Sequence, residues 1–183
     1  MKRLFFVPVM ATVLFLASCG GGNESSDTSA TSDTSTEATT PAAAADAPGA
    51  DIPGIDTVNV TDNIKIDGGD DMKFDRTLFK IKAGQDVKLT LKNIGKLPKE
   101  AMSHNVVILA QGTDVQAFGE AAVPAKPDHI PAAMATDVVA HTKLLGPGES
   151  DEITFKVTDP GVYEFICTFP GHFGTMRGKI VAE

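Results

Sequence analysis

The chain of 183 residues contains no tryptophan, one tyrosine and only two cysteines. Cys19 ends an apolar N-terminal segment, and Cys167 lies near the C-terminus. If Cys19 is consumed by modification, Cys167 is the only free thiol of the mature chain, and an intramolecular disulfide is excluded. A lone thiol in an exported protein tends to oxidise or to pair between chains unless it has another role, and metal ligation is one such role.

Positive charge is also scarce. The chain has 16 lysines and arginines against 24 acidic residues, a formal net charge of −8. This balance argues against nucleic acid as a partner. When Lys2 and Arg3 leave with the N-terminal segment the net charge falls by two, to −10, which fits a soluble domain in the periplasm or on the cell surface.

Residues 1–18 lack the length of a comfortable membrane span and have the layout of a secretory signal peptide, with Lys2 and Arg3 before an apolar stretch. The stretch ends in Leu16-Ala17-Ser18-Cys19, which resembles a bacterial lipobox. We therefore expect lipidation of Cys19 and a protein of the periplasm or cell envelope, lipid-anchored to a bacterial membrane. An ordinary cleavage site that happens to contain cysteine is the alternative.

Large apolar residues are nearly absent from residues 19–56, which are rich in Ser, Thr, Ala and Gly and carry acidic residues but no Lys or Arg. Such a segment cannot bury a core, so we expect a disordered linker. A flexible tether of this length has a root-mean-square reach of about 35 Å. Residues 57–183 then form one domain.

Short runs of period-two alternation, separated by turn residues, follow from residue 57 onward and are typical of an all-β sandwich or barrel. In "DVKLTLKN", Val87, Leu89 and Leu91 share one face. Alternation fails in Gly112–Pro131, for which we expect a partly helical flap outside the sheets. The expected strands are Thr57–Ile66, Met72–Phe74, Leu78–Lys82, Gln85–Lys92, Asn105–Ala110, Asp151–Thr158, Val162–Cys167 and Arg177–Ala182.

The run "CTFPGHFGTM" gathers the thiol of Cys167, the imidazole of His172 and the thioether of Met176 within ten residues. These ligand types suit copper, because sulfur favours Cu(I) and imidazole accommodates both oxidation states. His104, in "MSHNVVIL" at a strand mouth, offers a second imidazole. Two histidines, one cysteine and a weak axial methionine form the trigonal arrangement of a blue-copper electron-transfer centre.

These motifs resemble those of the azurins, within the cupredoxin family of type 1 blue copper proteins. "CTFPGHFGTM" matches the azurin ligand loop in spacing and filling, and three further stretches, Leu97–Val107, Ala140–Ser150 and Asp67–Asp75, match in register. The resemblance implies a Greek-key β-sandwich (the cupredoxin fold) with one type 1 copper at one end. The implied ligands are His104, Cys167, His172 and, as a distant axial ligand, Met176.

The resemblance also implies that the backbone carbonyl of Ser103 approaches the metal, although azurins have glycine there and a β-carbon narrows the accessible backbone angles. Azurins carry a disulfide for which no cysteine is available here. A buried titrating histidine of some azurins falls at Asn93, so its pH-linked effects should be absent.

Around the ligands, we expect Asn105 to tie the two ligand loops together and backbone N–H groups near Phe169 to donate to the Cys167 sulfur. Met102, Phe169 and Phe173 are expected to form an apolar collar that excludes water. Through that collar, the exposed edge of His172 is the expected exit for electrons.

The resulting hypothesis is an electron carrier that cycles Cu(II)/Cu(I), is not an enzyme, and meets transient redox proteins such as a cytochrome or an oxidase, with no small-molecule substrate. Copper storage or delivery is the alternative, although delivery sites are more exposed. A copper oxidase or nitrite reductase needs further histidines, and only His129 and His141 remain. We interpret His141 as structural, His129 as exposed in the flap, and Met72, Met102 and Met134 as packing residues. Zinc in the same site would be mis-metallation.

Overall fold

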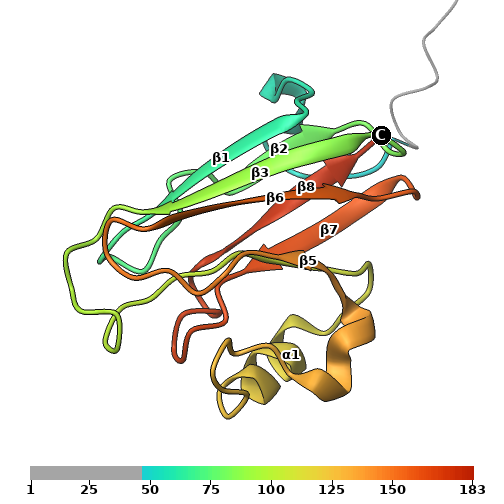
Figure 1. Ribbon diagram of the computed structural model, residues 1–183. Helices are drawn as coiled ribbons and strands as arrows, with labels where there is room; N and C mark the ends of the chain where they lie inside the picture. Colours follow the sequence, from blue (N-terminus) through green and yellow to red (C-terminus); the bar gives the residue numbers. More distant parts are fainter. Residues whose placement is uncertain (1–46) are drawn as a thin grey trace, which may run out of the picture. The chain divides into compact units, whose positions relative to one another are not determined.

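Alternating apolar residues build two β-sheets whose inner faces enclose the core (Figure 1). The computed structural model describes residues 47–183, so the expected signal peptide, Cys19 and the linker up to residue 46 lie outside the described residues. One sheet has the order β1-β3-β6, with bounds Asn63–Gly68, Asp86–Asn93 and Ser150–Lys156. The other has the order β2-β8-β7-β4-β5, with bounds Leu78–Ile81, Arg177–Ala182, Gly161–Ile166, Val107–Leu109 and Val138–His141.

Strand β3 illustrates why this sequence forms the sandwich. Val87, Leu89 and Leu91 are buried between the sheets, whereas the residues between them lie on the outer face. Leu89 pairs with Ile64 of the parallel strand β1 and with Ile153 of the antiparallel strand β6. A one-residue shift would bring lysines into the core, so the burial pattern fixes the register. The expected all-β sandwich is confirmed.

The flap, Gly112–Pro131, contains the one α-helix among the described residues, α1 (Val115–Ala122), and leads into the 3₁₀ segment η2 (Ala132–Asp137). Asp114 caps α1 by accepting hydrogen bonds from the backbone nitrogens of Gln116 and Ala117, at 2.9 and 3.1 Å. Phe118 of α1 packs with Val107, Leu109 and Ile166 in a second apolar cluster. Because Ile108 and Phe165 belong to the main core, strands β4 and β7 are covered on both faces.

Most expected strands agree with the structure to within two residues at each end, and three expectations differ by more. Strand β5 (Val138–His141) was not expected; it is short and three of its residues are half-buried, so it shows no alternation. Met72–Phe74 is not a strand, since only Phe74 forms an isolated bridge, to Gly68. The expected strand Thr57–Ile66 begins at Asn63, because Ile55–Thr57 forms a 3₁₀ turn, η1.

Residues 47–57, which we call the arm, fold against the five-stranded sheet although the linker was expected to extend to residue 56. Ile55 is buried, and backbone turns join Ala50 to Ala47 and Ile52 to Gly49 at 3.1 and 2.8 Å. A β-carbon on Gly49 would lie 3.0 Å from the Val181 side chain. Two isolated isoleucines thus suffice to order this part of a polar segment. Within residues 47–183, no helix has the length and apolarity needed to cross a membrane.

Candidate metal centre

Two loops at one end of the sandwich carry the expected ligands. Cys167 directly follows β7, Met176 directly precedes β8, and His172 lies in the turn between them. The turn is closed by backbone hydrogen bonds, from His172 to Phe169 at 3.0 Å, from Met176 to His172 at 2.8 Å and from Cys167 to Met176 at 2.9 Å. His104 lies in the other loop, just before β4, and bridges to Leu145. The β-ladders on either side therefore hold both loops in place.

The side chains of His104, Cys167 and His172 converge. The Cys167 sulfur lies 3.5 Å from Nδ1 of His172 and 4.0 Å from Nδ1 of His104. The three potential ligand atoms lie within 4.8 Å of one another, and all three residues are buried. In the part of the chain that the structure describes, no other three His, Cys, Asp or Glu side chains cluster in this way.

Met176 joins this cluster from beside His104. It is fully buried. A β-carbon on Gly68 would lie 2.9 Å from the Met176 methyl carbon and 3.2 Å from the His104 ring. The backbone of β1 therefore approaches both side chains closely, and only glycine fits there. The thioether and the imidazole are held next to each other by this contact.

Burial sets the protonation states of the cluster. Burial lowers the pKa of His172 to about 4, and the nearby His104 adds to the effect. Burial also lowers the pKa of His104. Burial raises the pKa of the Cys167 thiol to about 12, against the opposing effect of backbone N–H groups at Asn105 and Phe169. Near neutral pH both imidazoles are neutral and can donate their lone pairs to a metal, whereas the thiol must release its proton before its sulfur can bind one.

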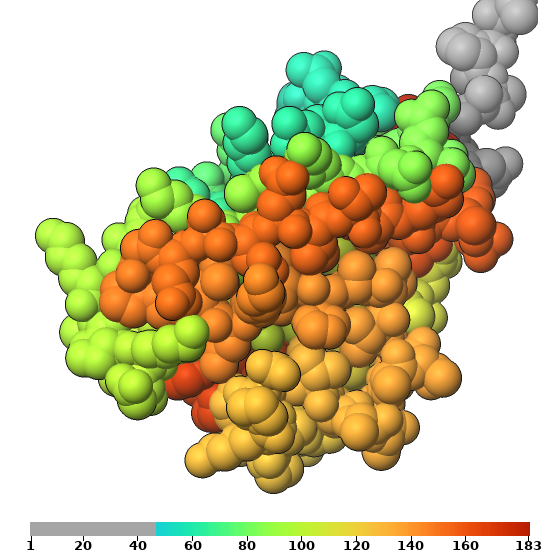
Figure 2. Space-filling view, in the orientation of Figure 1, coloured from blue at the N-terminus to red at the C-terminus, as the bar shows by residue number. Residues whose placement is uncertain are grey.

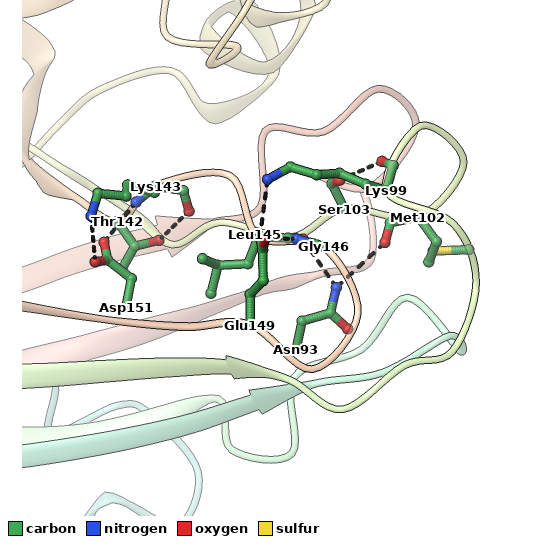
Figure 3. Close-up of polar contacts among 10 residues, drawn as sticks. All are labelled: Asn93, Lys99, Met102, Ser103, Thr142, Lys143, Leu145, Gly146, Glu149 and Asp151. Carbon is green, nitrogen blue, oxygen red and sulfur yellow. Dashed lines mark hydrogen bonds and ion pairs between the residues drawn. The ribbon is translucent and has the colours of Figure 1, made fainter.

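Polar contacts fix the loop that carries His104 (Figure 3). Asn93 donates to the backbone oxygens of Leu145 and, at 3.4 Å, of Met102. The Lys99 ammonium lies 3.0 Å from Glu149, which also accepts from the Gly146 backbone nitrogen at 2.7 Å.

Ser103 is buried in this loop, and its hydroxyl donates to the Lys99 carbonyl. Its own carbonyl oxygen lies 3.9 Å from the Cys167 sulfur. The serine side chain is thereby turned towards its own loop, while the carbonyl faces the ligand cluster.

Asn105 links the two ligand loops. Its amide nitrogen donates to the Thr168 hydroxyl at 2.8 Å, and its amide oxygen accepts from the Thr168 backbone nitrogen at 2.8 Å. Both residues are fully buried, so each bond satisfies a group that has no access to water.

The three expected collar residues have different surroundings. Phe169 lies 4.9 Å from the His172 ring, measured between centroids, and Met102 is half-buried. Phe173 instead packs against the second apolar cluster, beneath the flap. The expected exposed edge of His172 amounts to 2% of that residue's surface.

The expectation that His129 is exposed was wrong. It is 5% exposed, its Nδ1 lies 3.0 Å from the Ala122 carbonyl, and its ring meets Phe169 edge-on at 5.8 Å. No local pattern signalled this, because the partner Phe169 lies far away in the sequence. His141 is exposed and contacts the Thr142 carbonyl. Met134 packs on the second apolar cluster, whereas Met72 is 39% exposed and is not a core residue.

The donor set fits copper. It consists of one thiol, two neutral imidazoles and a thioether, a combination of soft and intermediate ligands that suits both copper oxidation states. The Nε2 atom of His104 is the one buried side-chain nitrogen or oxygen without a hydrogen-bond partner in residues 47–183. The Nδ1 atom of His104 faces the Cys167 sulfur. In the tautomer with the proton on Nε2, the lone pair of Nδ1 is therefore directed into the cluster.

This fold and this donor set define a single-site copper protein of the cupredoxin class. The family model of copper-binding proteins of the plastocyanin/azurin family matches residues 60–183, and the chain belongs to that family. It is a type 1 blue copper electron-transfer protein, not an enzyme, with the copper site formed by His104, Cys167, His172 and Met176.

Individual relatives agree with this assignment. The chain is 39% identical to azurin of Bordetella pertussis over 123 residues, 64% of this chain and 81% of that protein. It is 39% identical to outer membrane protein H.8 of Neisseria gonorrhoeae over 120 residues, 63% of this chain and 64% of that protein. Among solved structures, auracyanin of Roseiflexus castenholzii is 36% identical and covers 68% of this chain and 99% of its own, with a TM-score of 0.62.

Proposed function

We propose that the chain is a lipid-anchored electron carrier of the bacterial cell envelope, attached through Cys19 and exchanging single electrons with transient partners such as a cytochrome or an oxidase. The observation that carries the proposal is the buried convergence of Cys167, His104 and His172 within 4.8 Å. A site so enclosed favours electron transfer over the alternative, copper storage or delivery, which requires ligands that exchange readily.

The residues of the site have distinct tasks. Bound copper supplies the one-electron couple between Cu(II) and Cu(I). Cys167 gives up its thiol proton on loading, and His104 and His172 are already neutral near pH 7 because burial lowers the pKa of each. The Asn105–Thr168 bonds keep the two ligand loops at one separation. Ligands that do not move between oxidation states make outer-sphere transfer fast.

The Ser103 carbonyl is proposed as a further, weak contact to the metal. Its position 3.9 Å from the Cys167 sulfur supports this role. Phe169, over the His172 ring at 4.9 Å, and Met102 are proposed to keep water away from the ligands. The thin edge of His172 then serves as the electron exit, since every other side of the cluster is covered by protein.

The lipid anchor is supported by the sequence Leu16-Ala17-Ser18-Cys19 after an apolar leader. A relative named outer membrane protein H.8 supports a place in the cell envelope. An anchor would hold the carrier at high local concentration near membrane-bound redox partners.

The first test is a Cu(II) titration of the mature protein, followed by visible absorption and electron paramagnetic resonance, with Cys167→Ser as the control. We expect an intense blue charge-transfer band and a narrow copper hyperfine splitting, both lost in the control. An ordinary splitting with a weak band would mean that Cys167 does not bind Cu(II). Rapid loss of copper to a chelator without unfolding would favour the delivery alternative.

The anchor is tested separately, in bacterial cells that incorporate labelled fatty acid. The wild-type protein is expected to carry the label and to sediment with membranes, whereas Cys19→Ala should carry none. Equal sedimentation of both proteins would rule out attachment through Cys19.

A further inference from the structure

The flap contributes no ligand, yet it touches the Cys167–Met176 loop on both sides of His172. In Figure 2, red atoms from the C-terminal part of the chain are visible between the flap and the yellow-green atoms near residue 100. The contacts involve Phe173, the residue after His172, and Phe169, the ring that lies over His172.

The first contact is between Phe173 and the backbone of α1 at Gly119. A β-carbon on Gly119 would lie 2.4 Å from Cγ and 2.5 Å from Cδ2 of the Phe173 ring, closer than side chains approach. Alanine is favoured over glycine inside a helix by about 1 kcal/mol. A buried glycine at this position is therefore explained by the ring that it admits.

The second contact runs from the end of α1 through His129 to Phe169. The Nδ1 atom of His129 lies 3.0 Å from the Ala122 carbonyl and 3.1 Å from the Val123 carbonyl. Ala122 is the last residue of α1 and Val123 follows it as the C-cap, so the imidazole holds the flap at the end of the helix. The His129 ring meets Phe169 edge-on at 5.8 Å, and Phe169 lies 4.9 Å from His172.

A third and longer contact reaches the other ligand loop. The amide nitrogen of Asn105, which bonds to Thr168, also lies 3.4 Å from the backbone oxygen of Asp128 in the flap. The flap thus meets the ligand loops at three points.

We propose that the flap braces the ligand loop, and that Phe173, seated on Gly119, is a positioning residue for His172, with His129 supporting Phe169 in the same way. The inference rests on the copper site described above. Phe173 follows His172 directly in the chain, so a displacement of its ring that moves the backbone also changes the orientation of the imidazole. Partners outside the ligand shell that hold a ligand in place typically change metal affinity about 10- to 100-fold when they are removed.

The test uses Gly119→Ala, Phe173→Ala and the double variant, with Gly174→Ala as a matched control. A β-carbon on Gly174 meets nothing within 4 Å, so the control adds the same methyl group to the ligand loop without touching the brace. Copper release to a chelator, the hyperfine splitting and the reduction potential are measured for each protein.

Gly119→Ala is expected to release copper about tenfold faster than the wild type and to change the hyperfine splitting, because its methyl group displaces the Phe173 ring. The double variant should behave like Phe173→Ala alone, since the ring that the methyl would meet is gone. Gly174→Ala should match the wild type. Wild-type release and splitting in Gly119→Ala would overturn the proposal, as would a double variant whose effect is the sum of the two single ones.

Two further measurements guard against ambiguous results. If Gly119→Ala does not fold, Phe173→Leu replaces it: leucine keeps the site apolar, and unchanged copper release would overturn the brace. The His172 ring resonances of the metal-free protein are also recorded by nuclear magnetic resonance. They should broaden or shift in Gly119→Ala and not in Gly174→Ala, and the absence of any difference would overturn the brace whether or not copper gives a blue band. A wild type without that band would contradict the copper function alone.

Discussion

The two ends of the sandwich differ in what they bury. Towards the arm, the space between the sheets is filled by apolar side chains of the strands, such as Ile81, Val87 and Phe155. In residues 47–183 the buried polar side chains gather instead in the flap and around the copper loops: Asn93, Ser103, His104, Asn105, His129, Thr142, Thr168 and His172. Apolar packing is non-directional, whereas a buried polar group needs a particular partner. One end therefore supplies stability, and the other supplies geometry.

Leu89→Ala should have the largest effect on folding. Leu89 is fully buried and pairs with Ile64 and Ile153. Truncation leaves a cavity, so we expect a loss of about 2–5 kcal/mol in the free energy of unfolding, measured with urea. The blue band of the folded protein should be unchanged. A shifted band with an unchanged free energy of unfolding would mean that Leu89 controls the geometry of the copper site and not the stability of the fold.

Asn105→Ala should lower the free energy of unfolding by about 1–3 kcal/mol, because it leaves the buried Thr168 backbone nitrogen without a partner. Unlike Leu89→Ala, it should also speed the release of copper. Thr168→Val is the matched control, since it removes the hydroxyl but keeps the backbone bond to Asn105. Its effects should be smaller in both measurements; equal effects would mean that the bond to the Thr168 hydroxyl, and not the bond from its backbone nitrogen, accounts for the loss.

Acid should lower the free energy of unfolding of the metal-free protein, because of the buried histidines at the copper end. Burial lowers the pKa of His172 from 6.5 to about 4, so between these values the unfolded chain binds a proton that the folded chain does not. The free energy of unfolding should therefore fall as the pH is lowered from 6.5 to 4, and the lowered pKa of His104 acts in the same direction. Urea titrations at several pH values measure this slope.

The slope should shrink in His172→Gln and persist in the control His141→Gln, whose substituted histidine lies outside the ligand cluster. An equal slope in all three proteins would assign the acid sensitivity to other groups.

Lys156→Met should have the smallest effect. The Lys156 ammonium lies 3.1 Å from Asp86 on the outer face of the three-stranded sheet, and the two side chains are 46% and 70% exposed. Exposed ion pairs contribute between roughly zero and 1 kcal/mol. We expect a change within about 0.5 kcal/mol in the free energy of unfolding and no change in copper spectra. A larger loss would mean that the exterior contributes to the stability attributed to the core.

Local sequence patterns predicted what depends on nearby residues. The alternation around Leu89 predicted a strand and its buried face, and the spacing of Cys167, His172 and Met176 predicted ligands on one loop. The contact of these ligands with His104 could be predicted only from the resemblance to azurins. Neither segment by itself determines how close two strands that are distant in the sequence will lie.

The errors came from contacts across long stretches of sequence. His129 was expected to be exposed, but its burial depends on Phe169, which belongs to another loop. Phe173 was expected in the collar, a role that stays a prediction, and its packing under the flap with Ile166 and Phe118 was not expected. Composition likewise gave too little weight to Ile52 and Ile55, the two isoleucines that pack this end of a polar segment against the domain.

The arm determines where force from the N-terminal side acts on the domain. Gly49 lies against Val181, four residues and roughly 13 Å along β8 from Arg177, which follows the ligand Met176. A tether to a membrane would thus pull on the end of the sandwich opposite the copper. If Cys19 is anchored as proposed, the length of chain between Cys19 and the arm would limit how far from the membrane an electron can be transferred.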